Sequence, residues 1–284
     1  MITKIIMLDS TTVKKIEDFV YLKPRSIQEI SEHIAKNWRT ADRYVQEIEK
    51  EFGTIATRTF RQGTRGALKI VHWASIEKAS NSVFQEILEK QILTGKTKYD
   101  FSAFDIFQHV DNKNKTAALQ KHKNEEGTNL KHFLDFLKNT KKQLLVYSGN
   151  LSFINLKDKN GEAIKILEDL IRKNVSIKVI CRIDLAGKEN IEKLLSLNFK
   201  YGKEIVEIRH REQPLRAFIS DNKMFRIKEI KEPTNRKNEL AEKTFIFYTI
   251  KDKEWTEWLS RIFWKMFSSS VDSRKRIDEM KKLF

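Results

Sequence analysis

Residues 26–53 read SIQEISEHIAKNWRTADRYVQEIEKEFG, and this stretch decides how the first part of the chain folds. Ser26 is followed three residues later by Glu29, which is the spacing of a capping box at a helix start. The pattern breaks around Asn37, and Thr40 is placed to cap a second helix. The sequence therefore predicts two short helices joined by a tight turn. The apolar residues at helical spacing are Ile27, Ile30, Ile34 and Ala35 in the first helix and Ala41, Val45, Ile48 and Phe52 in the second.

The open face of the second helix is polar, and most of its polar residues lie near the N-terminus of the helix. A recognition helix presents side chains to base edges in the DNA major groove from this part of the helix. Ser26 and Lys36 are expected to position the two helices on DNA. The side chains expected to face bases are Arg39, Thr40, Arg43 and Gln46.

Two strand-like runs follow, Thr54–Phe60 and Ala67–Trp73, joined by a short basic loop that contains two glycines. A basic hairpin tip directly after such a helix resembles the wing of a winged helix. The resemblance implies that Arg61, Thr64 and Arg65 grip phosphate or the minor groove. The alternative is an ordinary helical hairpin followed by a β-hairpin.

The composition favours a phosphate-rich partner. The 284 residues include 55 Lys and Arg against 39 Asp and Glu, a formal net charge of +16. Such an excess favours nucleic acid through counterion release, but it does not separate DNA from RNA or from an anionic membrane surface.

The sequence also predicts a cytoplasmic location. Its single cysteine, Cys181, lies in an apolar run typical of a buried strand and cannot form an internal disulfide, which favours a reducing compartment. No apolar stretch approaches the roughly 18 residues that a membrane span needs, and the N-terminus has no signal-peptide pattern. We therefore expect no membrane partner.

The chain length suits two domains. We expect a winged helix-turn-helix domain over residues 1–74, and a connecting helix with a flexible linker over 75–128. Residues 129–284 then alternate helix-like and strand-like patterns, which predicts an α/β domain with a largely parallel sheet.

Three stretches of this second half carry a resemblance to a known fold: Leu145–Ser148, Arg172–Val179 and Pro214–Asp221, followed by a closing Trp-rich helix. Over roughly residues 128–270 the pattern resembles the phospholipase D-like fold, as found in the ligand-sensing half of archaeal TrmB-type transcriptional regulators. The resemblance implies a homodimer and a small-molecule effector. A dimer would also suit one winged helix per chain, because two half-sites double the DNA interface.

Active phospholipase D-like proteins carry the motif His-x-Lys-x-x-x-x-Asp. With Asp221 as the aspartate, Arg216 takes the lysine position and Pro214 takes the histidine position, and a proline cannot be a nucleophile. His210 lies four residues before that position. We therefore expect no catalytic residue and no enzyme activity.

The same region offers candidates for binding a ligand. Arg216 and Asp221 form either part of a polar pocket or a structural ion pair, and the ion pair is the interpretation favoured by the sequence. The full set of candidate ligand-binding residues is Ser148, Asn150, Arg216 and Asp221. The histidines are scattered without metal-ligand spacing, and no phosphate-binding loop motif occurs, so no metal or cofactor is expected.

Together these patterns predict a sequence-specific transcriptional regulator that binds double-stranded DNA and carries a catalytically degenerate second domain for sensing or dimerisation. The main alternative is a nuclease or phosphodiesterase, dependent on Asp221 and His210, to which the winged helix delivers DNA. A third possibility is a chromatin or defence factor that binds DNA without sequence preference.

Overall fold

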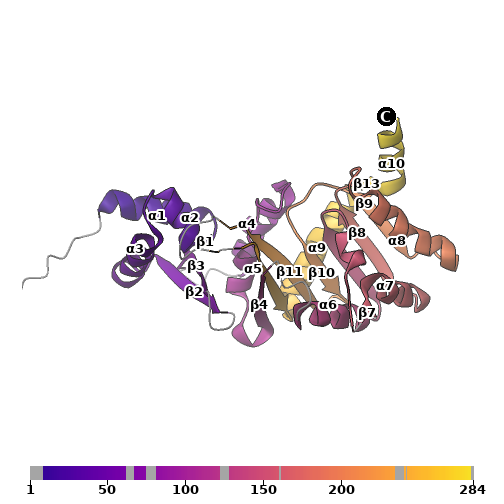
Figure 1. Cartoon of the computed structure of the whole chain (residues 1–284), viewed down its shortest axis with the longest axis horizontal. Helices are drawn as coiled ribbons and strands as arrows, with labels where there is room; N and C mark the ends of the chain where they lie inside the picture. The colour runs from indigo at the N-terminus through magenta and orange to yellow at the C-terminus, as the bar shows by residue number, and fades with distance from the viewer. Residues whose placement is uncertain are drawn as a thin grey trace, which may run out of the picture. The chain divides into compact units, whose positions relative to one another are not determined.

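The computed structural model describes residues 9–61, 67–74, 81–121, 128–159, 161–233, 240 and 242–282. The chain divides into two compact units. Unit 1 comprises residues 1–83 and 231–244, and unit 2 comprises residues 84–230 and 245–284. The architecture is mixed α/β, and Figure 1 labels its elements.

Unit 1 contains three helices and a small antiparallel sheet (Figure 1). Its sheet has the order β1-β3-β2, so the last strand lies between the other two. In chain order the elements are α1 (Ser10–Leu22), β1 (Arg25–Ser26), α2 (Ile27–His33), α3 (Trp38–Glu51), β2 (Ile55–Arg61) and β3 (Ala67–Trp73). Aliphatic side chains from all three helices and from β2 and β3 form one core that includes Ile16, Ile30, Val45, Ile48, Ile55 and Val71.

The predicted capping box of α2 is confirmed. Ser26 Oγ accepts the Glu29 N–H at 3.2 Å, and Glu29 Oε2 accepts the Ser26 N–H at 2.8 Å. The helix ends in a Schellman turn, in which Ala35 has a left-handed φ of 52° and the Lys36 N–H donates to the Ser31 carbonyl at 2.9 Å. Backbone groups at both ends of this short helix therefore find hydrogen-bond partners among residues within the predicted stretch.

The predicted cap of α3 is wrong. Asn37 is the N-cap, and its Oδ1 accepts the Thr40 N–H at 2.9 Å, so Thr40 lies inside the first turn. Asn and Thr are both good caps, and in this chain Asn37 is the one that begins the helix. Phe52 was also misplaced: it is the C-cap and is 51% exposed, because Gly53 with φ 64° turns the chain away there.

A second stretch of chain belongs to unit 1. Lys231 is the last residue of β11 (Met224–Lys231), and its Nζ lies 3.4 Å from Glu29 Oε2. The Leu240 N–H donates to Gln28 Oε1 at 3.2 Å. Lys231 and Leu240 are thus held to α2, although they follow most of unit 2 in sequence.

Unit 2 is built on an eight-stranded mixed sheet with the order β13-β9-β8-β5-β10-β11-β12-β4. Strands β5, β8 and β9 run parallel, whereas β10 is antiparallel to β5 and to β11, and β13 is antiparallel to β9. The expectation of a largely parallel sheet was therefore wrong, because helical crossovers join only the first three of these strands. The strands not yet bounded are β4 (Lys115–Lys121), β5 (Gln143–Ser148), β8 (Ser176–Cys181), β9 (Val206–His210), β10 (Ala217–Ser220), β12 (Thr244–Ile250) and β13 (Val271–Asp272).

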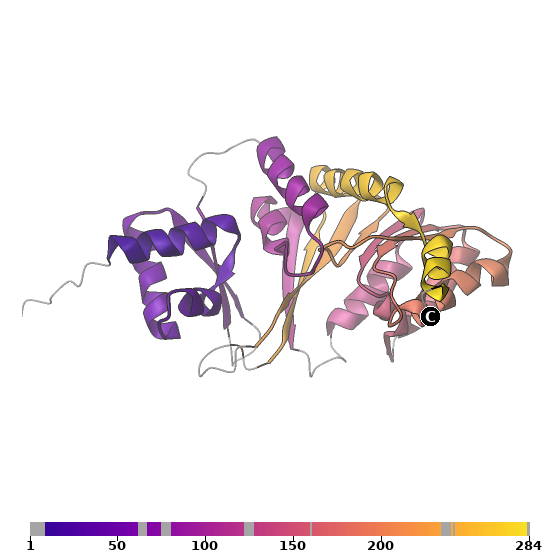
Figure 2. The same cartoon turned by 90° about the horizontal axis from the view of Figure 1, so that it is seen from above.

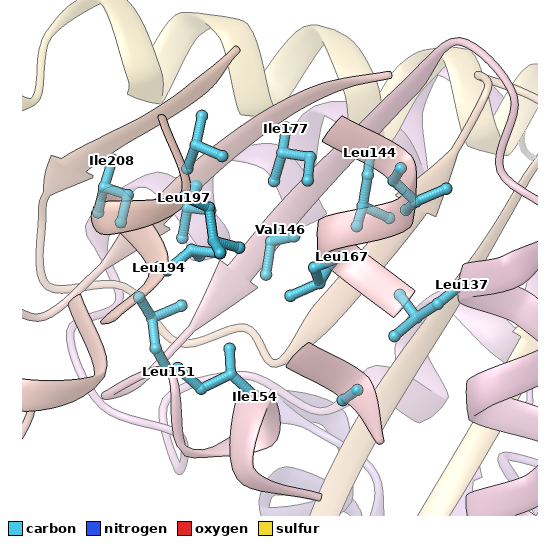
Figure 3. Close-up of a cluster of buried hydrophobic side chains, with 14 of the residues drawn as sticks. Leu137, Leu144, Val146, Leu151, Ile154, Leu167, Ile177, Leu194, Leu197 and Ile208 are labelled. Carbon is cyan, nitrogen blue, oxygen red and sulfur yellow. The ribbon is translucent and has the colours of Figure 1, made fainter. Parts of the chain in front are cut away.

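Helices cover both faces of this sheet (Figure 2). On one face lie α6 (Thr128–Lys138), α7 (Ala163–Arg172) and α8 (Lys188–Tyr201), and the aliphatic core there also takes in α10 (Ser273–Lys281). Figure 3 shows part of that core, including Leu144, Val146, Leu167 and Ile177. On the other face α9 (Lys253–Ser268) packs Phe263 against Tyr147, with ring centroids 5.2 Å apart.

The range 75–128, expected to be a connecting helix and a flexible linker, holds several elements of unit 2. They are α4 (Asn81–Thr94), α5 (Ala103–His109), the 3-10 turn η1 (Asn112–Asn114) and β4. Strand β4 is polar because it is an edge strand whose side chains are mostly half-buried. Residues 75–80 and 122–127 of that range lie outside the described residues.

Two further details bear on the sequence-based expectations. Cys181 is buried at the end of β8, and this burial raises the pKa of its thiol to about 12. Of the helices in the described part of the chain, none is long and apolar enough to cross a membrane.

Candidate functional site

The outer face of α3 carries an exposed polar stripe. Its members are spaced four, three and four residues apart, so they line one side of the helix. The opposite side buries Ala41, Val45 and Ile48 in the core of unit 1. The exposed stripe consists of Arg39, Arg43, Gln46 and Lys50.

The contacts that these side chains make are weak. Arg43 Nε lies 3.7 Å from Glu47 Oε1, and this pair is exposed. Gln46 donates to Asp42 Oδ2 at 2.8 Å. Surface contacts of this kind contribute at most about 1 kcal/mol. The α3 side chains can therefore exchange these partners for a ligand at little cost.

The other residues predicted to bind DNA lie in varied surroundings. Lys36 is exposed in the turn before α3, and Thr40 is half-buried. Ser26 is buried, and its hydroxyl is occupied by the capping box, so it holds α2 in place. Thr64, Arg65 and the side chain of Arg61 lie outside the described residues.

In unit 2, a cavity of about 250 Å³ opens at the end of β5. Side chains alternate along a strand, so two rows cross the same face of the sheet. In one row Phe218 pairs in register with Val146 and with Arg226. In the next row Arg216 lies opposite Lys228, whose N–H donates to the Arg216 carbonyl at 2.8 Å. The cavity lies against these rows and brings together Ser148, Asn150 and Arg216.

Arg216 is held at the cavity by the backbone around it. Its Nη1 donates to the Leu215 carbonyl at 2.7 Å. The guanidinium packs on Gly149, where an added Cβ would lie 2.9 Å from Nη2. Burial, followed by the nearby charge of Arg182, lowers the pKa of Arg216. A glycine at position 149 is therefore what lets the guanidinium approach the end of β5.

Asp221 does not join this group. It lies in the turn after β10, where its carboxylate accepts the N–H groups of Lys141, Lys142 and Gln143 at 2.7–3.2 Å. No described ion pair links it to Arg216, so the favoured interpretation of a structural ion pair between them was wrong. The carboxylate instead fixes the entry into β5.

Neither Pro214 nor His210, the two positions considered for a catalytic histidine, lies among the described residues that line the cavity. Pro214 is buried, and its ring packs against Gly95. His210 lies at the end of β9, where its Nδ1 accepts the Ile183 N–H at 2.9 Å. Burial, followed by the charge of Arg276, lowers the pKa of His210.

Sequence reasoning missed the two other cationic residues that line the cavity, Arg226 and Lys228. In β11 they alternate with the buried Phe225 and Ile227. This alternation is typical of a strand with one solvated face. It gave no sign that Arg226 would be buried.

Comparisons with known proteins give likenesses of fold at low identity. No protein-family model matches the sequence, and no curated protein matches it. One similar solved structure is that of TrmBL2, an archaeal chromatin protein that shows a novel mode of DNA binding. It has 14% sequence identity and a TM-score of 0.40, and the match covers 93% of this chain and 94% of that chain.

Two further solved structures cover a smaller share of this chain. The phospholipase D family member Nuc from Salmonella typhimurium has 10% identity and a TM-score of 0.40, covering 56% of this chain and 97% of that chain. NucT from Helicobacter pylori has the same identity and TM-score, covering 56% and 99%. Likenesses this distant do not assign a function to the chain.

Proposed function

We propose that this protein is a DNA-binding transcriptional regulator. In this proposal unit 1 is a winged helix-turn-helix domain whose α3 enters the major groove. The observation that carries it is the exposed stripe on α3, with two arginines and a glutamine on a helix that follows a short helix and a tight turn. Arginine and glutamine are side chains that read guanine and adenine edges in that groove.

The surroundings of α3 support this role. The hairpin of β2 and β3 follows α3 directly, as the wing does in a winged helix, and the sequence between these two strands includes Arg65. The net charge of +16 adds a long-range attraction to the DNA backbone. Arg39, Arg43 and Gln46 would contact bases, and Lys36 would contact phosphate.

Unit 2 is assigned to ligand sensing or dimerisation. The position at which the phospholipase D-like motif has its histidine holds a buried proline, which cannot attack phosphorus. The cavity beside Arg216 offers a place for an effector. We propose a homodimer that acts in the cytosol on a palindromic site and has no catalytic activity.

The test is a double charge reversal on α3. Arg39→Glu with Arg43→Glu is expected to weaken binding to a selected duplex by about 30-fold or more, because each lost base contact is worth about 1–3 kcal/mol. The matched control is Arg274→Glu with Lys275→Glu, an equal charge change at two exposed positions of α10. The control should change the affinity only a few-fold.

Equal losses in both variants would show that net charge alone drives binding, and the proposal for α3 would fail. The duplex would first be selected from a random library at near-physiological salt. An enriched palindrome supports a dimeric regulator. Uniform recovery of the library would favour a chromatin factor, and cleavage of the duplex would favour the nuclease alternative.

A further inference from the structure

We infer that the cavity in unit 2 binds a small organic anion, whose charged head is held by Arg226 and whose apolar body contacts the phenylalanines of the cavity wall. This inference rests on the proposed sensing role of unit 2 for its use in regulation. The binding itself depends only on the cavity.

Arg226 is the observation that points to a ligand. Arg226 is only 7% exposed, and its side chain lines the cavity. Within the described part of the chain, neither its Nε nor its Nη1 has a hydrogen-bond partner. The aromatic ring of Phe247 lies 5.9 Å from its guanidinium carbon. A buried charge without a hydrogen-bonded partner is strongly unfavourable, so such groups in proteins are paired or bind a ligand.

The charge of Arg226 remains at physiological pH. Burial lowers the pKa of its guanidinium from 12.5 to about 10, which is still well above 7. The cavity therefore contains a cation in the working protein. An anion that enters would recover the favourable interaction that burial removes.

The other charged side chains that line the cavity are also positive. Arg216 and Lys228 also line it, and none of the described lining residues is acidic. A neutral polyol would leave the guanidinium of Arg226 without a charged acceptor, whereas a carboxylate or phosphate head would pair with it. The hydroxyl of Ser148 and the amide of Asn150 add neutral hydrogen-bonding groups at the end of β5.

The remainder of the wall is aromatic and sets the second requirement on the ligand. Phe218 packs edge-on against Phe133 and Phe153, with both ring-centroid distances at 4.8 Å. Leu156, which is 38% exposed, also lines the cavity. A bare inorganic ion would leave this surface without a partner. The volume of about 250 Å³ is below the roughly 300–1,000 Å³ of pockets for drug-sized molecules, so the ligand is small.

The test uses the full chain and isothermal titration calorimetry with probes of matched shape. Benzoate and phenyl phosphate supply an aromatic body with a carboxylate or phosphate head, and benzamide is the neutral match of benzoate. Inorganic phosphate supplies the head alone. We expect saturable binding of at least one of the two aromatic anions, and at least tenfold weaker binding of benzamide and of inorganic phosphate.

Variants connect this binding to Arg226. Arg226→Met should weaken binding of the aromatic anion at least tenfold, and Arg226→Lys should keep part of it because the charge remains. Lys223→Met is the control, since Lys223 is an exposed cation in the turn before β11. Equal binding of benzoate and benzamide, unchanged binding by Arg226→Met, or no binding of either aromatic anion at millimolar concentration would each overturn the inference.

The two proposals fail separately in this design. The α3 variant Arg39→Glu with Arg43→Glu should bind the aromatic anion as the wild type does. A protein that binds the anion but no DNA would contradict the proposed function alone. A protein that binds DNA but no anion would contradict this inference alone.

Discussion

Replacing Arg226 by methionine should stabilise the protein when no ligand is present. Burial lowers the pKa of this guanidinium from 12.5 to about 10. Each tenfold change in proton affinity corresponds to about 1.4 kcal/mol, so keeping the buried cation costs the folded state about 3 kcal/mol. Methionine has no charge to bury and fills irregular apolar space well.

The pH dependence of this effect follows from the direction of the shift. The folded pKa lies below the unfolded one, so the unfolded chain binds the proton more tightly. Below pH 10 both states are charged and the full cost applies. The cost falls as the pH rises from about 10 towards 12.5. Measurements at pH 7 therefore compare the variants under the full effect.

Urea unfolding followed by tryptophan fluorescence would measure the change. We expect Arg226→Met to raise the free energy of unfolding by about 2–3 kcal/mol. Arg182→Met is the control, because Arg182 is an exposed arginine in a surface pair with Asp184. Arg182→Met should lower the free energy of unfolding by no more than about 1 kcal/mol. A loss of stability in Arg226→Met would show that the charge is paired in the folded protein, and the reasoning would be refuted.

Four further substitutions test other features. Ala35→Gly should stabilise unit 1 and Gly53→Ala should destabilise it, each by about 1 kcal/mol in urea unfolding, because both positions have left-handed φ. Gly149→Val should weaken binding of the aromatic anion several-fold in calorimetry, because its Cβ would displace the guanidinium of Arg216. Asp221→Ala should lower the free energy of unfolding by about 2 kcal/mol, because backbone N–H groups lose their charged acceptor.

Each of these predictions has a contradicting result. A destabilising Ala35→Gly or a stabilising Gly53→Ala would mean that the left-handed φ at that position does not favour glycine. Unchanged anion affinity in Gly149→Val would remove Arg216 from the binding site. An effect of Asp221→Ala below about 0.5 kcal/mol would show that water replaces the carboxylate fully.

The sequence predicted features that depend on neighbours along the chain. Ser26 and Glu29 are three residues apart and make the expected cap, because a capping box needs nothing outside its own turn. The start of α3 was missed because Asn37 and Thr40 are both competent caps. Thr40 alone was predicted as the cap, and the observed cap lies three residues earlier.

Features that depend on distant contacts were not predictable in this way. The burial of Arg226 follows from its pairing with Phe218 and from the approach of Phe247, neither of which is visible in the pattern of β11. The polar strand β4 resembled a linker because an edge strand needs few apolar residues. The expected pairing of Arg216 with Asp221 failed because the turn directs Asp221 to the backbone before β5.

The divided sequence of unit 1 has a consequence for the order in which the protein matures. Residues 231–244 belong to this unit, yet the ribosome makes them after residues 84–230 of unit 2. Domains generally fold during synthesis as they emerge, at about 5–20 residues per second. Residues 1–83 of unit 1 are made before unit 2, but unit 1 is completed only after most of unit 2 has been made. Unit 1 therefore cannot be produced intact as a simple N-terminal fragment that ends before unit 2.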